Sequence, residues 1–236
     1  MKKLFRLLHD RNLILLFALA LAFNAFHMRD WYQRGVLWSD AEGYYLYLPA
    51  LFIYGGFDKI PIRTEAQFPK YPGTEKRFTK YTNGVAFMQA PFFFAAHLRA
   101  KADRKADGYS SFYIYGVLWA ALFYAVSGVW LLVKTLSRHF SRTVAWFAVM
   151  AVFWGTNLFH YTVHEPGMSH VYSFFLVSCL VWLSPKLYEE PPSRKWILLS
   201  GLAAGMMVLI RPTNIVLLLY PALYGVSAWS AFKERL

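Results

Sequence analysis

The segment YSSFYIYGVLWAALFYAVSGVWLLV, from Tyr109 to Val133, is 25 residues long and contains no charged side chain. Because a helix needs roughly 20 apolar residues to cross the hydrocarbon core of a bilayer, this segment predicts a transmembrane helix. The whole chain is 57% hydrophobic and only 16% charged, whereas soluble domains carry about 45–50% apolar and about 25% charged residues. This composition excludes a disordered chain, a collagen and a disulfide scaffold. It predicts an all-α integral membrane protein with a single membrane domain over residues 1–236.

Other apolar blocks on both sides of this segment bring the predicted number of spans to about six. The predicted spans are 13–27, 109–133, 143–161, 168–184, 196–210 and 213–229. Only Arg211 and Pro212 separate the last two. One helix through both would be roughly 50 Å long, too long for one bilayer, so we expect a tight turn between them. For the first block a cleaved signal peptide is the alternative, because it follows Lys2, Lys3, Arg6 and Arg11.

The apolar stretch from Gly84 to Leu98 decides the topology, because a span there would move every later loop to the other side of the membrane. Basic side chains collect in short cytoplasmic loops. If this stretch does not span, only Arg211 among the short-loop basic residues lies outside, and eight lie in the cytoplasm: Lys134, Arg138, Arg142, Lys186, Arg194, Lys195, Lys233 and Arg235. We therefore predict a cytoplasmic N-terminus and a long external loop over residues 28–108. This loop would hold two amphipathic surface helices, at Tyr44–Tyr54 and Gly84–Leu98.

The formal net charge is +12. In a soluble protein such a charge would indicate binding to nucleic acid. Here many of the basic residues flank apolar blocks, which is the pattern that orients membrane helices. We therefore expect membrane lipid, and no nucleic acid, among the partners.

Three polar clusters lie far apart in the sequence, yet the predicted topology puts all of them at the outer ends of helices. The first is Asp40 with Glu42. The second is an external turn that carries His160, His164, Glu165, Ser169 and His170. The third is Arg211 with Thr213 and Asn214. Their shared side predicts one outward-facing site.

Each cluster also has a purely structural explanation. Asp40 would cap a helix that begins near Gly43, and His164 with Glu165 would be ordinary turn residues at a membrane interface. A zinc site with the H-E-x-x-H spacing needs a histidine at position 168, where Met168 stands. An arginine between apolar helices costs a few kcal/mol unless it reaches water, a headgroup or an anion. Arg211 would therefore extend to lipid phosphates or form an anion site.

An outward-facing carboxylate beside a cation at membrane level suits a lipid-phosphate substrate. Asp40 would take a proton from an incoming hydroxyl, and Arg211 would bind a phosphate leaving group. Lipid-linked sugars match this chemistry, because they are embedded in the membrane and activated at a phosphate. Aromatic residues of the external loop would contact sugar rings or prenyl chains, although aromatic residues gather at any bilayer interface. They are Tyr44, Tyr45, Tyr47, Phe68, Tyr71 and Tyr81.

Four stretches, in order along the chain, resemble motifs of the bacterial GT-C glycosyltransferases, the polytopic class that includes protein mannosyltransferases and lipid A aminoarabinose transferases. The acidic motif SDAEGYYLYLP covers residues 39–49, and YTNG at 81–84 leads into APFF at 90–93. GTN at 155–157 precedes HEPGMSH at 164–170, and RPTN stands at 211–214. The resemblance spans nearly the whole chain.

This resemblance implies a GT-C-like N-terminal module in the bacterial inner membrane with its active face toward the periplasm. The implied activity is transfer of a sugar, with inversion, from a polyprenyl-phosphate carrier. Asp40 would be the catalytic base, with Glu42 beside it. The substrate-binding residues would be Arg211, His164, Glu165, His170, Tyr44, Tyr45 and Asn214. Some members bind a divalent cation, Mg²⁺ or Mn²⁺, for which Asp40 and Glu42 would supply part of the ligands.

The chain departs from this class in length, because members usually have more spans and often a soluble C-terminal domain, whereas this sequence stops at Leu236. Three explanations stay open: a truncated gene, one half of a split enzyme, or a reduced relative with a partner subunit that supplies the missing C-terminal part. The alternative function is a non-catalytic membrane subunit that binds a lipid-linked glycan or assembles with a larger complex. A lipid-phosphate hydrolase or transporter is the third hypothesis.

Overall fold

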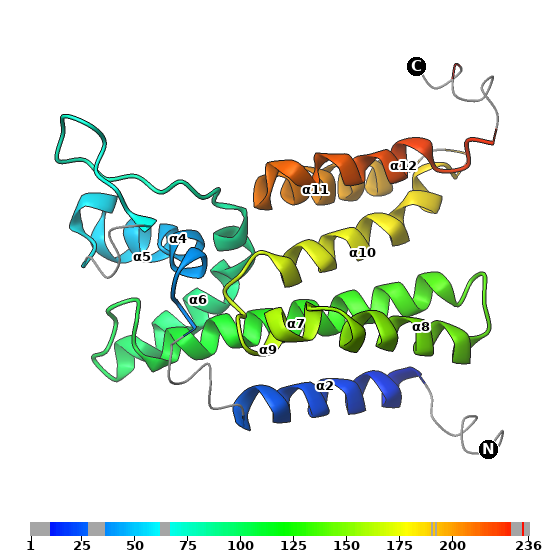
Figure 1. Cartoon of the computed structure of the whole chain (residues 1–236), viewed down its shortest axis with the longest axis horizontal. Helices are drawn as coiled ribbons and strands as arrows, with labels where there is room; N and C mark the ends of the chain where they lie inside the picture. Colours follow the sequence, from blue (N-terminus) through cyan, green and yellow to red (C-terminus); the bar gives the residue numbers. More distant parts are fainter. Residues whose placement is uncertain are drawn as a thin grey trace.

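The computed structural model describes residues 10–27, 36–61, 67–189, 191, 193–227 and 233. Over these ranges the predicted all-α class is confirmed: helices are joined by loops, and no strand is present beyond one isolated bridge between Lys70 and Arg77. The elements in chain order (Figure 1) are α2 (Asp10–His27), α4 (Asp40–Tyr45), α5 (Tyr47–Pro49), η1 (Ala50–Tyr54), η2 (Phe57–Lys59), α6 (Gly84–Ala102), α7 (Ser111–Leu136), α8 (Arg142–Gly155), α9 (Leu158–Val163), α10 (His170–Leu187), α11 (Arg194–Ile210), η4 (Pro212–Leu218) and α12 (Leu219–Leu223).

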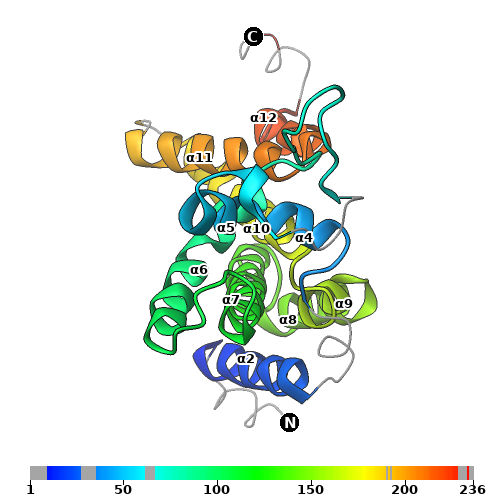
Figure 2. The same ribbon diagram turned by 90° about the vertical axis from the view of Figure 1, so that its left-hand side faces the viewer.

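The central helix of the bundle is α7, which packs against α2, α6, α8, α9 and α10. A further layer follows, because α11 packs against α10. The longer helices lie roughly side by side in Figure 1, and Figure 2 shows α7 in the middle when the bundle is seen from one end. The short helices α4 and α5 lie at that end, in front of the bundle (Figure 2).

Among the described residues, two helices are long and apolar enough to cross a membrane. They are α7 and α10, which correspond to the predicted spans 109–133 and 168–184. The helix Arg142–Gly155 and the segment Pro212–Leu223 are apolar but shorter. The structure therefore gives membrane-helix character to two of the six predicted spans, and the remaining four stay a prediction.

Two predicted spans are not continuous α-helices. The span at 143–161 is divided, because α8 ends at Gly155, Thr156 is extended and α9 begins at Leu158. The Thr156 hydroxyl donates to Val152 O (2.8 Å) and accepts from Leu158 N (3.2 Å), so this side chain replaces helical hydrogen bonds at the break. The span at 213–229 starts as the 3₁₀ helix η4 and continues as α12 to Leu223.

Both segments predicted as amphipathic surface helices are helical, with shifted ends, but α6 packs against α7 as part of the bundle, and their position at a membrane surface stays a prediction. The first extends from Asp40 to Tyr54 as α4, α5 and η1, and the second is α6, which continues past Leu98 to Ala102. Several predictions fall outside the described residues. They concern residues 28–35 at the start of the predicted external loop, residues 228–229 at the end of the last predicted span, and the basic residues Lys2, Lys3, Arg6 and Arg235.

Close helix contacts and one ion pair hold the bundle together. A Cβ added at Gly128 of α7 would lie 2.6 Å from the Phe174 ring, so glycine lets α10 approach closely. At the opposite end from α4, Arg142 Nε donates to Asp10 Oδ1 (2.5 Å), and Trp146 Nε1 donates to the same oxygen (3.0 Å). These two bonds connect the start of α2 to the start of α8.

Candidate functional site

Asp40 is the first residue of α4, and its carboxylate accepts a hydrogen bond from the Tyr81 hydroxyl. The residue at the N-cap position is Ser39, whose side chain makes no capping bond. Ser39 has a φ of +50°, a strained value for a residue with a side chain. The N-cap explanation for Asp40 is therefore wrong, and its carboxylate instead faces a side chain from a loop about forty residues downstream.

Tyr81 is held against α4 from several sides. Its ring lies 4.8 Å from the Tyr44 ring, and its backbone carbonyl accepts the Tyr47 hydroxyl at 2.6 Å. Its hydroxyl also lies 2.5 Å from Gln67 Oε1. A phenol has one hydrogen to donate, so an ionised Asp40 competes with Gln67 for it. Burial and the hydrogen bond to Asp40 raise the pKa of Tyr81 above its ordinary value, so this side chain stays a donor at neutral pH.

Gly43 allows this close approach. A Cβ at this position would lie 2.1 Å from Tyr81 Cδ2, far inside normal contact. Thr79 reinforces the contact, because its hydroxyl donates to Gly43 O at 3.2 Å. The helix start at Asp40 and the loop at 79–81 thus form one packed unit.

The neighbours of Asp40 differ from it in exposure. Asp40 is partly exposed, whereas Glu42 is only 6% exposed and Tyr45 only 1%. The Tyr45 hydroxyl donates to Gly108 O at 2.6 Å, so this side chain attaches α4 to the loop before α7. Asp40 is therefore the carboxylate of this pair that a ligand can approach, and Tyr45 belongs to the core.

The predicted external turn packs directly on α4. A Cβ added at Gly167 would lie 2.6 Å from the Cβ of Ala41, the residue between Asp40 and Glu42. Side chains of α10 and α6 stabilise the turn, because the Tyr172 hydroxyl donates to Pro166 O (3.0 Å) and accepts from Gln89 Nε2 (2.9 Å). The first and second polar clusters of the sequence are thus in contact in the fold.

The histidines of this turn stack rather than converge on one point. The His160 ring stacks on His164 at 5.1 Å, and His160 Nε2 lies 3.7 Å from Glu165 Oε1. The His170 ring stacks on Tyr161 at 3.6 Å. Its Nδ1 is buried without a hydrogen-bond partner.

Arg211 follows α11 in extended conformation, with φ −148° and ψ 119°, as the following proline favours. The end of α11 touches the loop that carries Tyr81, because the Thr82 hydroxyl donates to Ile210 O at 2.9 Å. A Cβ added at Gly84 would lie 2.5 Å from Ile210 N. The third cluster is thus connected to Asp40 through two consecutive residues, Tyr81 and Thr82.

Asn214 fixes the turn after Arg211. Its Nδ2 donates to Ser173 Oγ and to Met207 O, both at 3.1 Å. These bonds join η4 to the first turn of α10 and the last turn of α11. Arg211 is exposed and lies within electrostatic range of His170, so a cation faces the same region as the turn.

The three predicted clusters therefore meet at one end of the bundle, through Ala41, Gly167 and the segment 81–84. Sequence reasoning assigned no role to Tyr81 in holding Asp40, although the YTNG motif contains it. It missed Gln67 altogether, since a single glutamine in a polar loop carries no periodic or motif signal.

The predicted cation site has an incomplete ligand set in the described part of the chain. No group of three or more His, Cys, Asp or Glu side chains there is placed to hold a metal ion. Asp40 is partly exposed and Glu42 is only 6% exposed, so Asp40 alone of this pair is open to a ligand. We therefore assign no step to a cation.

Comparisons with protein families, with curated proteins and with solved structures returned no match to this chain.

Proposed function

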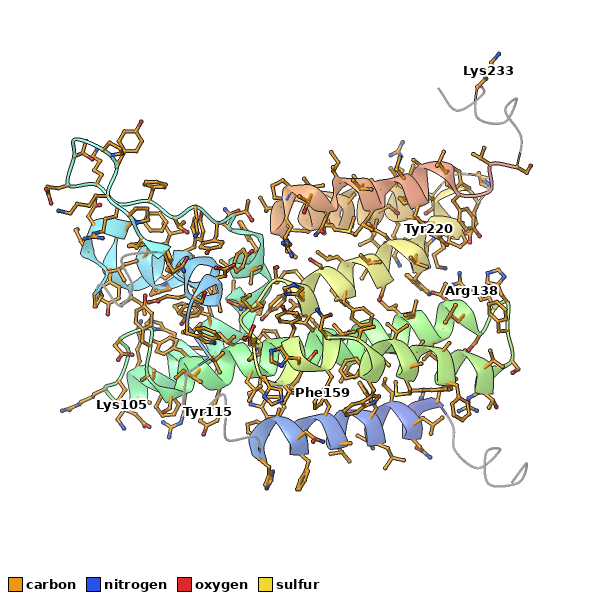
Figure 3. All side chains as sticks on the ribbon, viewed as in Figure 1. Lys105, Tyr115, Arg138, Phe159, Tyr220 and Lys233 are labelled. Carbon is orange, nitrogen blue, oxygen red and sulfur yellow. The ribbon has the colours of Figure 1, made fainter. Side chains whose placement is uncertain are left out.

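We propose that the chain is a multi-pass protein of the bacterial inner membrane with its candidate site at the periplasmic end. Large apolar side chains are exposed around the bundle, among them Phe23, Phe147, Leu198 and Leu202, and a lipid environment accounts for such a surface. Arg138 and Lys233 lie at the end of the molecule opposite α4 (Figure 3). Arg138 stands in the short loop between α7 and α8, and basic residues of short loops collect on the cytoplasmic side, so its position supports a cytoplasmic assignment for that end.

We further propose that the chain is an inverting glycosyltransferase of GT-C type that uses a polyprenyl-phosphate sugar. Asp40 takes the proton of the acceptor hydroxyl, and the hydroxyl oxygen forms a bond to the anomeric carbon. The bond between that carbon and the carrier phosphate breaks, and the phosphate oxygen leaves with the electron pair. Arg211 stabilises the negative charge of this leaving phosphate.

The remaining residues have supporting roles in this proposal. Tyr81 orients the Asp40 carboxylate, and Asn214 positions the backbone beside Arg211. His164, Glu165 and His170 of the turn bind the donor, whereas Tyr44, which is only 8% exposed, packs against the Tyr81 ring. The observation that carries the proposal is the pair of contacts from Gly167 to Ala41 and from Thr82 to Ile210, because they bring base, turn and cation to one end.

The test uses the full chain in membranes and a panel of polyprenyl-phosphate hexoses, with release of polyprenyl phosphate as the readout. Asp40→Asn should lower the rate by about 10²–10⁴, the usual contribution of a general base. Glu75→Gln is the matched control, because Glu75 is an exposed carboxylate of the same external loop, ion-paired with Lys70. Equal rates for Asp40→Asn and Glu75→Gln would contradict the role of Asp40.

A non-catalytic subunit is the second candidate, and one surface favours it. The outer side of α11 and η4 exposes Leu198, Leu202, Ile215 and Val216, and a Cβ at Gly201 would meet nothing within 4 Å. Small residues on an apolar helix allow close packing by another helix. A stoichiometric partner that co-purifies with the chain, together with no turnover by the chain alone, would favour this candidate over the enzyme.

A further inference from the structure

A cavity lies against α6, and neither Asp40 nor any other residue of α4 is among its lining residues. It has a volume of about 640 Å³ and is enclosed by α2, α6 and α7, a size typical of small-molecule and lipid sites. One face of α6 contributes Phe92, Ala95, Ala96 and Arg99. Another side of α6 carries Phe93, which contacts Tyr45 of α4, and His97, which contacts Tyr113 of α7. The cavity and α4 thus lie against different sides of α6.

The cavity is an open groove, lined by small residues and by aromatic rings. Ala18 and Ala22 of α2, Ala95 and Ala96 of α6 and Gly116 of α7 line it. A Cβ added at Gly116 would lie 3.2 Å from Phe92 O, so glycine lets α6 and α7 approach closely there. Trp119 and Phe123, both about half exposed, form the open side. Phe26 of α2 closes one edge through its ring contact with Trp119 at 5.2 Å.

The groove has the length and direction of a lipid chain. Its α7 lining extends from Phe112 to Ser127, which is roughly 22 Å along a helix that rises about 1.5 Å per residue. That length exceeds half of the about 30 Å hydrocarbon core, the depth of one leaflet. The groove follows α7, one of the two helices long enough to span a membrane.

One end of the groove is basic. Arg99 is the charged residue of the lining, with its guanidinium over the Phe112 ring (5.3 Å) and one nitrogen 2.5 Å from Asp103 Oδ1. Three more basic residues follow it at the end of α6 and in the next loop: Lys101, Arg104 and Lys105. Figure 3 shows Lys105 and Tyr115 at this same end of the molecule.

Few acidic groups offset this charge. The other carboxylate of the segment, Asp107, is engaged in the turn before α7, where it accepts from Tyr109 N and Ser110 N. Four basic and two acidic residues between Arg99 and Asp107 leave a net positive end.

From the apolar groove with a basic end, we infer a binding site for an anionic glycerophospholipid, with an acyl chain between α2, α6 and α7 and the phosphate at Arg99. The inference rests only on the membrane placement proposed above and is independent of sugar transfer. The net positive charge beside Arg99 selects an anionic headgroup over a zwitterionic one, because both carry a phosphate but only the anionic lipid carries a net charge. A resident lipid there would fill the space between α2 and the rest of the bundle.

Quenching of tryptophan fluorescence by brominated lipids tests the site with the full chain in phosphatidylcholine vesicles. Dibrominated phosphatidylglycerol should quench more strongly than dibrominated phosphatidylcholine. Trp119→Phe should remove this excess, because Trp119 lines the groove. Trp130→Phe is the matched control: it removes an exposed tryptophan of the same helix outside the groove, and the excess should remain.

Charge and shape variants complete the test. Arg99→Gln should reduce the preference for phosphatidylglycerol about fivefold, the effect of one basic residue at an anionic lipid surface. Asp103→Asn should raise the preference for phosphatidylglycerol, because the substitution removes the ion pair with the Arg99 guanidinium. Ala95→Leu should weaken quenching by both lipids, because it narrows the groove at an exposed position that tolerates the larger side chain.

Three outcomes would overturn the inference. The first is equal quenching by the two headgroups, and the second is retention of the excess in Trp119→Phe. The third is displacement of the brominated lipid by polyprenyl monophosphate at lower concentration than by phosphatidylglycerol, which would assign the groove to a carrier lipid instead. None of these outcomes depends on turnover, so failure here and failure of the glycosyltransferase proposal are distinguishable.

Discussion

Gly43→Ala should disrupt the contact between α4 and Tyr81 on which the candidate site depends. The added Cβ would lie 2.1 Å from Tyr81 Cδ2 and 2.2 Å from Cε2, so the ring must retreat by more than 1 Å to reach ordinary contact. The ring has little freedom to do so, because its hydroxyl is bonded to Asp40 and its carbonyl accepts from Tyr47. Either the clash stays or the bond to Asp40 breaks.

Both outcomes have a similar cost. An overpacked site loses about 1–3 kcal/mol, and a hydrogen bond to a charged group contributes about 1.5–3 kcal/mol. Alanine in place of a helical glycine returns about 0.5–1 kcal/mol. We expect Gly43→Ala to lower the free energy of unfolding by about 1–2 kcal/mol, measured by denaturant titration of the full chain in detergent micelles.

Two comparisons separate the clash from a general effect of alanine. Gly201→Ala is the matched control, because a Cβ there meets nothing within 4 Å; it should be neutral or stabilising by up to about 1 kcal/mol. In a Tyr81→Ala background the obstructing ring is absent, so Gly43→Ala should no longer destabilise. A penalty for Gly43→Ala that is as large in the Tyr81→Ala background as in the wild type would refute the reasoning.

Two further predictions concern the contacts on either side of this unit. Asn214→Ala should destabilise the chain by about 1–2 kcal/mol, because it removes the donor to Ser173 Oγ and to Met207 O. Thr213→Ala, a change at the neighbouring position, should be near neutral. Equal effects of the two substitutions would argue against a stabilising role of the Asn214 hydrogen bonds. Burial, together with the charge of Lys101, lowers the pKa of His97, so the unfolded chain takes up a proton first and stability should fall as the pH drops through and below about 6.5. His97→Gln should reduce the fall of the thermal melting temperature with decreasing pH. His139→Gln, at an exposed histidine, should leave that pH dependence unchanged.

Local sequence patterns were sufficient for much of the fold. Apolar length alone located α7 and α10, because the requirement for span length is met within each segment. The same patterns missed the break at Thr156, where a hydroxyl bonds to the backbone on both sides. Gly155 and Asn157 flank this threonine and are typical of helix ends, and Asn157 is indeed the N-cap of α9. Apolar length alone gave these two residues no weight.

For the candidate site, the sequence predicted only that the three polar clusters lie on the same side of the membrane. The topology placed Asp40, the turn around Gly167 and Arg211 at the outer ends of helices, and the packing of Gly167 on Ala41 agrees with that placement. Tyr45 was predicted to contact substrate, yet it is buried and bonded to Gly108. Its exposure depends on how α4 lies on α6, which no spacing within the SDAEGYYLYLP motif specifies.

The sequence by itself determined that the described chain is helical and where its most apolar helices lie, because hydrophobic length and helix-breaking residues act locally. Only the tertiary structure decided which polar groups meet. Tyr81 reaches Asp40 because a glycine at position 43 leaves room for its ring, and Thr82 reaches the end of α11 across more than a hundred residues. Such contacts depend on the packing of whole helices, and that packing is a property of the assembled bundle rather than of any one segment.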